Sequence, residues 1–199
     1  MNAHKIVDIL LEDEDFDMEG YALAAITPVE AYDLAKANPE LRPQLERVIA
    51  MDEERSFTYA FYVLEGSFPA GEPVIATSSW WSYIYAKDVL EGSFPAGEPA
   101  IATDATCSYS YANDVLKGKP FPAGEPAIAT NAEFSCNYAR FCLKGKPFPL
   151  GEPAIATDAG WSYEYAFNVI ERRFPLGEPA IATNRQIAVA YNHYVGTNI

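Results

Sequence analysis

Histidine, cysteine and long apolar runs are all scarce in this chain of 199 residues. The two histidines, His4 and His193, lie near opposite ends of the sequence. A histidine-based metal site, or a Ser/Cys–His nucleophilic pair, would need other ligands or a nucleophile close to one of them. We therefore expect two histidines at the surface, with no metal and no cofactor.

The three cysteines, Cys107, Cys136 and Cys142, are odd in number and lack the Cys-x-x-Cys spacing of metal and redox sites. They are expected to be buried thiols in a reducing, cytoplasmic setting. No apolar run approaches the roughly 20 residues that cross a bilayer. The first residues also lack the small-residue cleavage site of a secretory signal, so neither membrane insertion nor secretion is expected.

Basic residues are half as frequent as acidic ones: 14 Lys and Arg stand against 28 Asp and Glu, a net charge of −14. Phosphate contacts need cations, so this balance argues against direct nucleic-acid binding and favours a basic protein partner or simple solubility. The acid is concentrated early, with 15 acidic and 5 basic residues in 1–65 and 13 and 9 in 66–199. Its densest stretch comprises Glu12, Asp13, Glu14, Asp15, Asp17 and Glu19.

This acidic stretch has three interpretations. A calcium loop of the EF-hand type would need Gly at its sixth position and Glu at its twelfth, and both are missing. A solvated acidic cap and a functional acidic patch for a basic, nucleic-acid-binding partner both stay open.

What the chain has in abundance is repetition. The string Gly-Glu-Pro-(Ala/Val)-Ile-Ala-Thr begins at Gly71, Gly97, Gly124, Gly151 and Gly177, which are 26 or 27 residues apart. A degraded copy begins at Arg42 and aligns without gaps to Phe68 onward. We therefore predict a tandem array over 41–199, with units starting near 42, 68, 94, 121, 148 and 174, preceded by an acidic helical cap over 1–40.

Each unit is predicted to hold two helices. The longer one follows a residue whose short side chain can cap its first turn: Asp52, Ser78, Asp104, Asn131, Asp158 or Asn184. It is predicted to end at a left-handed glycine, namely Gly66, Gly92, Gly118 or Gly145, before a Phe-Pro or Pro-Phe-Pro step. The shorter helix is expected to open around Pro73 and its equivalents, since proline is accepted in a first turn.

Comparison of the units with one another separates two faces of the long helix. The positions of Trp81, Ser82, Tyr85, Ala86 and Val89 stay nearly constant and are predicted to pack, facing a core of isoleucines from the short helices. The opposite stripe varies and carries large apolar residues, which indicates a binding face, although drift on a solvated surface is an alternative. Its candidate residues are Trp80, Ile84, Lys87, Arg140, Phe141, Glu164 and Phe167.

One glutamate recurs at the start of every short helix. These residues are Glu72, Glu98, Glu125, Glu152 and Glu178. Glutamate is favoured at a helix N-terminus by the helix dipole and can cap free N–H groups there, which is the structural interpretation. The functional one is an acidic ladder that faces a basic partner.

The repeat unit resembles short helical repeats of many uncharacterised tailed-phage and bacterial proteins. Their pattern is Arg-Trp-Pro-Glu-(Ala/Gly)-Glu-Pro-x-Ile, followed by a Tyr-Ala-rich helix that ends Val-Ile-x-Gly. Residues 173–181, Arg-Phe-Pro-Leu-Gly-Glu-Pro-Ala-Ile, match it best, with Phe174 in place of the usual Trp. The resemblance covers about residues 40–195. It implies a right-handed α-solenoid in a phage or prophage setting and carries no catalytic residue.

The sequence therefore predicts an all-α fold, a right-handed α-solenoid of two-helix repeats with atypical capping units. The expected function is non-catalytic protein binding. One example is a phage protein that inhibits a host defence or nucleic-acid enzyme by occupying the basic cleft of that enzyme. The alternative is a structural, self-assembling protein. The more apolar C-terminal unit, with Ile187, Val189 and Tyr191, is expected to support a homodimer.

Overall fold

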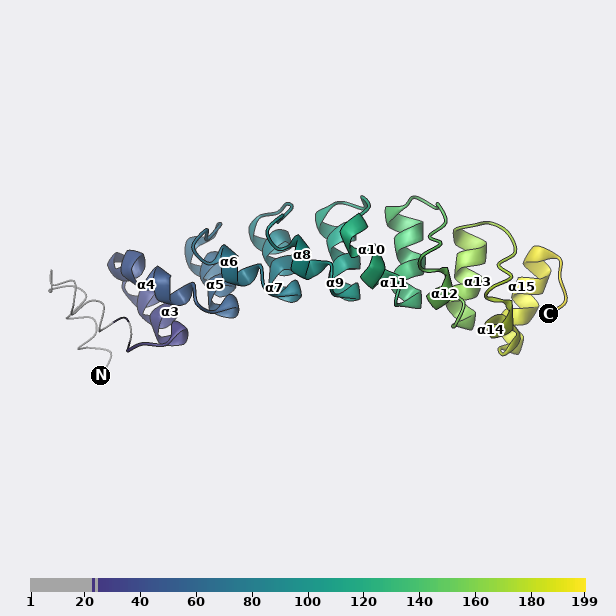
Figure 1. The fold of residues 1–199 in the computed structure, drawn as a ribbon, viewed down its shortest axis with the longest axis horizontal. Coiled ribbons are helices and arrows are strands. Elements are labelled where there is room, and N and C mark those ends of the chain that lie inside the picture. Colours follow the sequence, from purple (N-terminus) through teal and green to yellow (C-terminus); the bar gives the residue numbers. More distant parts are fainter. Residues whose placement is uncertain (1–22, 24) are drawn as a thin grey trace. The chain divides into compact units, whose positions relative to one another are not determined.

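The computed structural model describes residue 23 and residues 25–199, and all regular secondary structure of this part is helical. The chain forms two compact units, of which the first ends at Gly97 and the second begins at Glu98. Each unit is a succession of short helices in which sequence neighbours pack side by side (Figure 1). The predicted all-α repeat architecture is confirmed. The division falls inside the repeat predicted to begin near residue 94.

In the described part of the first unit, the N-terminus of α3 carries a capping box formed by Thr27 and Glu30. Its long helices α5 and α7 each continue into a short π-helical segment. Its elements are α3 (Pro28–Ala37), the 3₁₀ turn η1 (Pro39–Leu41), α4 (Arg42–Ile49), α5 (Glu53–Tyr59), η2 (Ala60–Leu64), α6 (Glu72–Ile75), α7 (Ser79–Ile84) and η3 (Tyr85–Val89).

The second unit repeats the pattern of a four- or five-residue helix followed by a longer one. Helix α11 packs against α9 and α13, the long helices of the neighbouring repeats. The elements are α8 (Glu98–Ile101), α9 (Ala105–Ser110), η4 (Tyr111–Val115), η5 (Pro122–Gly124), α10 (Glu125–Ile128), α11 (Ala132–Asn137), η6 (Tyr138–Cys142), α12 (Glu152–Ile155), α13 (Ala159–Asn168), α14 (Glu178–Ala182) and α15 (Arg185–Val195). No helix in the described part is long and apolar enough to cross a membrane.

The six predicted N-caps are confirmed. The side chain of Asp52 accepts a hydrogen bond from the backbone N–H of Arg55 at 2.8 Å, and Asp104 accepts one from Cys107 at the same distance. The equivalents Ser78, Asn131, Asp158 and Asn184 cap their helices in the same way. Each cap supplies an acceptor to an N–H group that has no partner within its own helix.

The helix ends differ from the prediction. The left-handed residue is the one before the glycine, namely Glu65, Glu91, Lys117 or Lys144, and in the repeat without that glycine it is Glu171, with φ between 49° and 59°. Gly118 and Gly145 are also left-handed, whereas Gly66 and Gly92 are not. The last turn is widened: the carbonyl of Tyr85 accepts from the N–H of Leu90, five residues later, at 2.9 Å. Periodicity gives no signal for this wide turn. In the repeat of α13 the carbonyl of Tyr165 accepts both from Ile170 at 3.0 Å and, as in an ordinary α-turn, from Val169 at 3.1 Å.

The constant stripe forms the core as predicted. The tyrosines at the position of Tyr85, the alanines after them and the isoleucines of the short helices are fully buried. The buried serines hold each long helix against its own short helix; Ser135 Oγ, for example, donates to the carbonyl of Ile128 at 3.0 Å. One constant position is corrected. Trp81, Phe134 and Trp161 are only half-buried, because they lie at the rim of the stripe.

The glycine that opens each short helix is required by close packing. A Cβ atom built on Gly71 would lie 2.5 Å from Cδ1 of Phe68 and 2.7 Å from Cβ of Ser56. Gly66, five residues earlier, has its nearest neighbour at 3.8 Å and no positive φ.

We therefore predict opposite outcomes for two alanine substitutions in the first unit. Gly71→Ala should destabilise the protein by about 1–3 kcal/mol through overpacking, whereas Gly66→Ala should leave stability nearly unchanged. The urea midpoint of each variant, followed by far-ultraviolet circular dichroism, measures the difference. Equal midpoints for the two variants would contradict the packing described here.

Candidate protein-binding face

A buried tyrosine hydroxyl joins the parts of each repeat. Tyr138 donates to Oε1 of Glu125 at 3.0 Å and accepts from the backbone N–H of Phe121 at 2.8 Å. The glutamate and the phenylalanine lie 13 and 17 residues before the tyrosine, on the short helix and on the turn that leads into it. The same pair of bonds is made by Tyr85, Tyr165 and Tyr191.

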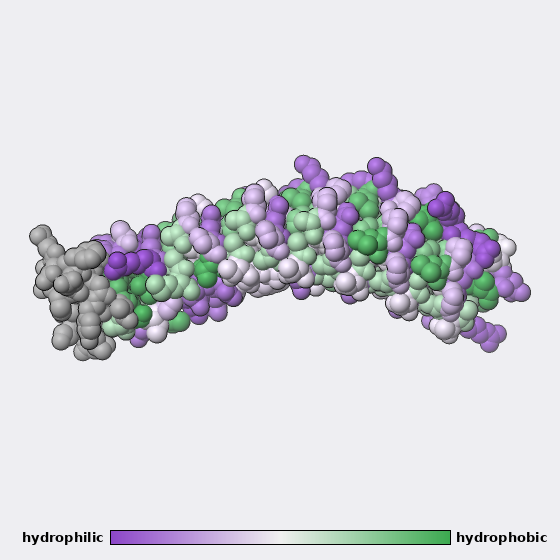
Figure 2. Space-filling view, viewed as in Figure 1, coloured by the Kyte–Doolittle hydropathy of each residue, from purple (hydrophilic) through white to green (hydrophobic). Residues whose placement is uncertain are grey.

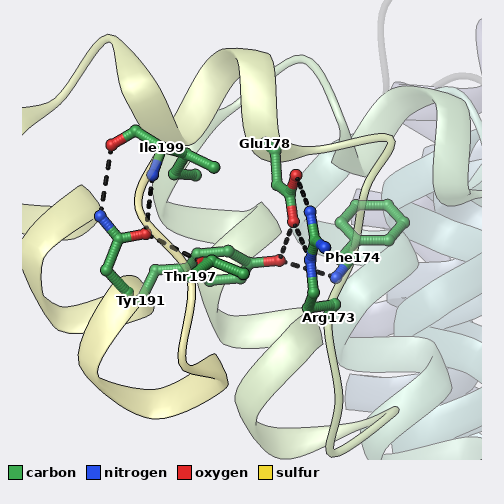
Figure 3. Close-up of polar contacts among 7 residues, drawn as sticks. Arg173, Phe174, Glu178, Tyr191, Thr197 and Ile199 are labelled. Carbon is green, nitrogen blue, oxygen red and sulfur yellow. Dashed lines mark hydrogen bonds and ion pairs between the residues drawn. The ribbon is translucent and has the colours of Figure 1, made fainter.

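Figure 3 shows the last of these clusters, in which the Tyr191 hydroxyl lies between the Glu178 carboxylate and the backbone nitrogen of Phe174. Burial raises the pKa of Tyr191, and likewise of Tyr85, Tyr138 and Tyr165. The hydroxyls therefore stay protonated and keep donating to the glutamates over the physiological range.

The acidic ladder takes part in these clusters. The described partner of each ladder carboxylate is a tyrosine hydroxyl, with Tyr111 on Glu98 at 2.8 Å as the shortest case. All five glutamates are half-buried. The first repeat contains a further pair of this kind, between Tyr59 and Glu46. The ladder prediction did not include Glu46 because the sequence of this repeat is degraded. The ladder carboxylates thus bind tyrosine hydroxyls inside the repeats, from the first turn of each short helix.

One ladder residue carries an extra ion pair. The guanidinium of Arg173 lies on Glu178, with Nε 2.8 Å from Oε1 and Nη2 2.7 Å from Oε2 (Figure 3). The hydrogen bond from Arg173 is the main cause that lowers the pKa of Glu178 below its usual value of 4.5. The ion pair therefore links Arg173, in the turn before α14, to Glu178, the first residue of that helix.

The varied stripe faces solvent, as its prediction required. The side chains of Trp80, Phe141 and Phe167 are 51%, 44% and 45% exposed. Lys87 and Arg140 are exposed, while Ile84 and Glu164 are half-buried. Figure 2 shows hydrophobic and hydrophilic side chains side by side along the visible surface of each unit. The candidate face is therefore accessible and mixed in character.

In the first unit the face has an aromatic character that the candidate list missed in part. Trp80 packs on Tyr83 with ring centroids 5.9 Å apart, and the Lys87 ammonium lies 5.6 Å from the Tyr83 ring. Phe61 and Tyr62, 38% and 64% exposed, are an edge-on pair at 4.8 Å. The ungapped 26-residue alignment contains the signal for both, because it places them at the positions of Lys87 and Asp88.

In the second unit the face runs from η6 to α15. Arg140 lies over the ring of Phe141 at 5.1 Å and reaches Glu164 at 4.0 Å. Phe167 packs against Tyr163 at 5.8 Å. It also meets Tyr194 edge-on at 4.8 Å. These contacts hold exposed aromatic rings in place, which lowers the entropy that they lose when a partner binds.

The predicted C-terminal dimer patch is not assembled as expected. Tyr191 is fully buried in its cluster with Glu178, because it occupies the core position of its repeat. Val189 is 64% exposed and Ile187 is half-buried. Asn192 stands where the other repeats have a buried alanine, and its amide binds the backbone of Ile199. The last helix therefore uses Asn192 to hold the tail that follows it.

The remaining candidate groups show no reactive cluster. Cys107, Cys136 and Cys142 are buried and free, and burial raises the pKa of Cys136 to about 12 and of Cys142 to about 11. No group of three metal-ligating side chains lies within the described residues. His193 is exposed. The acidic patch from Glu12 to Glu19 and His4 lie outside the described residues.

Comparison with known proteins gives no relative: no family model, no curated protein and no solved structure matches the chain.

The Arg173–Glu178 pair predicts a dependence of stability on pH. Because the folded-state pKa of Glu178 is lowered, its contribution is present above pH 4.5 and is lost as the pH falls below that value. Arg173→Gln should therefore lower the urea midpoint at pH 7, and this deficit should shrink as the pH falls below 4.5. Arg172→Gln, which alters an exposed neighbour, is the control. A deficit of Arg173→Gln that stays constant as the pH is lowered would show that the ion pair is not its cause.

Cysteine reactivity supplies a second check. The raised pKa values of Cys136 and Cys142 keep both as thiols at pH 8, and their burial blocks attack. A disulfide reagent should therefore modify the native protein at least about a hundredfold more slowly than the urea-unfolded chain. Rapid modification of the native protein at either residue would contradict the buried placement.

Proposed function

We propose that this chain is a non-catalytic binding module that recognises a protein through the varied face of its long helices. The carrying observation is the concentration of exposed Trp, Phe and Tyr side chains on this face, next to Lys87, Arg140 and Glu164. Aromatic residues and arginine are the side chains that contribute most to protein–protein binding. Isolated exposed apolar residues need no explanation, but several on the same stripe within a unit do.

The constant cluster supports this role. Because Tyr138, Glu125 and the phenylalanine turn hold each repeat together from inside, the outward positions can change without loss of the fold. The face thus has the division found in repeat proteins that bind, with a fixed stacking surface and a variable recognition surface. A host protein is one partner of this kind in the phage setting that the resemblance implies, and the net charge of −14 favours one with a basic cleft.

The experiment uses the full chain as bait in a lysate of the cell in which it acts. The face variant changes Trp80, Phe141 and Phe167 to Ser. Each change removes a large side chain that the partner would bury in the complex. The amount of each specific partner captured should therefore fall at least about tenfold. Quantitative mass spectrometry of the captured proteins measures the change.

The matched control changes Leu150 and Leu176 to Ser. Both are 53% exposed, more than any of the three anchors, yet they lie in the turns before the short helices and away from the face. The control should retain the partners of the wild type. Equal retention by the wild type, the face variant and the control would refute the face as the binding surface.

A further inference from the structure

The turn after each long helix carries a charged residue whose sign changes along the array. Its left-handed residue is Glu65 and Glu91 in the first unit, Lys117 and Lys144 in the first two such turns of the second unit, and Glu171 in the third. Gly-Ser-Phe follows Glu65 and Glu91, whereas Gly-Lys-Pro-Phe follows the two lysines in the 27-residue repeats. The extra residue therefore accompanies a second lysine in each of two turns, at Lys119 and Lys146.

Each pair of turns borders a depression. In the first unit a cavity of about 220 Å³ is lined by Phe61, Glu65, Gly66, Asp88, Val89 and Glu91. In the second, a cavity of about 280 Å³ is lined by Gly118, Lys119, Pro120, Cys142, Leu143, Lys144 and Lys146. We name the first the acidic edge, defined by Glu65, Asp88 and Glu91. The second is the basic edge, defined by Lys117, Lys119, Lys144 and Lys146.

The charges on both edges are available. All seven side chains are exposed, and none forms an ion pair within the part of the chain that the structure describes. The one recorded contact is the Lys144 ammonium, which donates to the carbonyl of Phe141 at 2.9 Å. Three lysines that line one depression, with Lys117 in the same turn as Lys119, are a local reversal of the overall field in a protein of net charge −14.

We propose that the acidic edge of one copy of this chain binds the basic edge of a second copy. The two edges are built on the same left-handed turn of successive repeats and differ in the sign of the charge. The charges on each edge are therefore separated by one repeat, so the spacing of the negative charges matches that of the positive ones. Apolar groups also line both depressions, with Phe61 and Val89 on one and Pro120 and Leu143 on the other, so contact buries apolar surface as well.

A polyanion fits the basic edge less well than a second copy. Sequence-tolerant binding of single-stranded nucleic acid relies on exposed aromatic rings that stack on the bases. No aromatic ring lines the basic edge, since Phe121 and Phe148 of these turns are buried. The net charge of −14 would also repel a long polyanion, whereas an edge-to-edge contact depends on charges at close range.

Individual exposed ion pairs contribute about 0–1 kcal/mol, so the association rests on several of them together. It should be weak and sensitive to salt, and it should disappear at about 500 mM salt, where the screening length is only about 4 Å.

The test exchanges charges between equivalent positions. One variant carries Glu65→Lys and Glu91→Lys, and the other carries Lys117→Glu and Lys144→Glu. Since the chain itself places both residue types at this left-handed position, neither variant should disturb the fold. Sedimentation velocity of the full chain at about 20 mM salt measures the assembly.

We expect the wild type to associate, each variant alone to weaken association at least about tenfold, and an equimolar mixture of the two variants to restore it. A wild type that stays monomeric at every concentration overturns the proposal, even if a single-stranded oligonucleotide binds its lysines. So does association that persists in either variant alone, or a mixture that stays monomeric. The face variant with Trp80, Phe141 and Phe167 changed to Ser should still associate, which separates this outcome from that of the proposed function.

Discussion

The buried hydroxyl of the repeated tyrosine is the contact on which the rest of the structure depends. The turn into each short helix brings a backbone N–H into the core, at Phe121 for example, where no carbonyl completes it. An unsatisfied buried N–H would cost about 1–3 kcal/mol. The hydroxyl of Tyr138 accepts from this N–H, and its own proton then needs an acceptor, which Glu125 provides. Phenylalanine turn, glutamate and tyrosine are therefore constant together in the repeats from Phe68 onward, and only the degraded first repeat has Arg42 in place of the phenylalanine.

This arrangement explains why one face of the long helix is free to vary. Tyr138, Ala139 and Ser135 are fully buried and link the long helix to its short partner and to the turn. Arg140 and Phe141, directly after them in sequence, point to solvent and take no part in those links. Recognition residues can thus change from repeat to repeat while the internal bonds persist. The turns after the long helices can vary in the same way, since Glu91 and Lys117 have the same left-handed backbone conformation but opposite charge.

The sequence predicts much of this fold because its signals are local or periodic. The caps at Asp52 and Asp104, the buried isoleucines and the exposed Trp80 all follow from comparison of the repeats. The bond between Glu125 and Tyr138 does not, because it spans 13 residues and two helices, a separation with no helical period. The same holds for Tyr191, which a local pattern places on an apolar surface and the cluster places in the core. The left-handed Glu65 was missed because propensity alone assigns that conformation to Gly66.

The handedness of the array and its phage setting stay predictions from the resemblance. The role of the acidic stretch from Glu12 to Glu19 stays a prediction from its charge.

The central claim is that the tyrosine hydroxyl closes each repeat from inside, and amide hydrogen exchange tests it most directly. The backbone N–H of Phe121 and of Phe148 lies in a turn yet donates to a buried hydroxyl at 2.8 Å. These amides should exchange as slowly as the helical amides of Ala129 and Ala156, since all open only when the repeats unfold. Exchange of Phe121 and Phe148 at the rate of exposed loop amides, in a protein whose helical amides stay protected, would contradict the account.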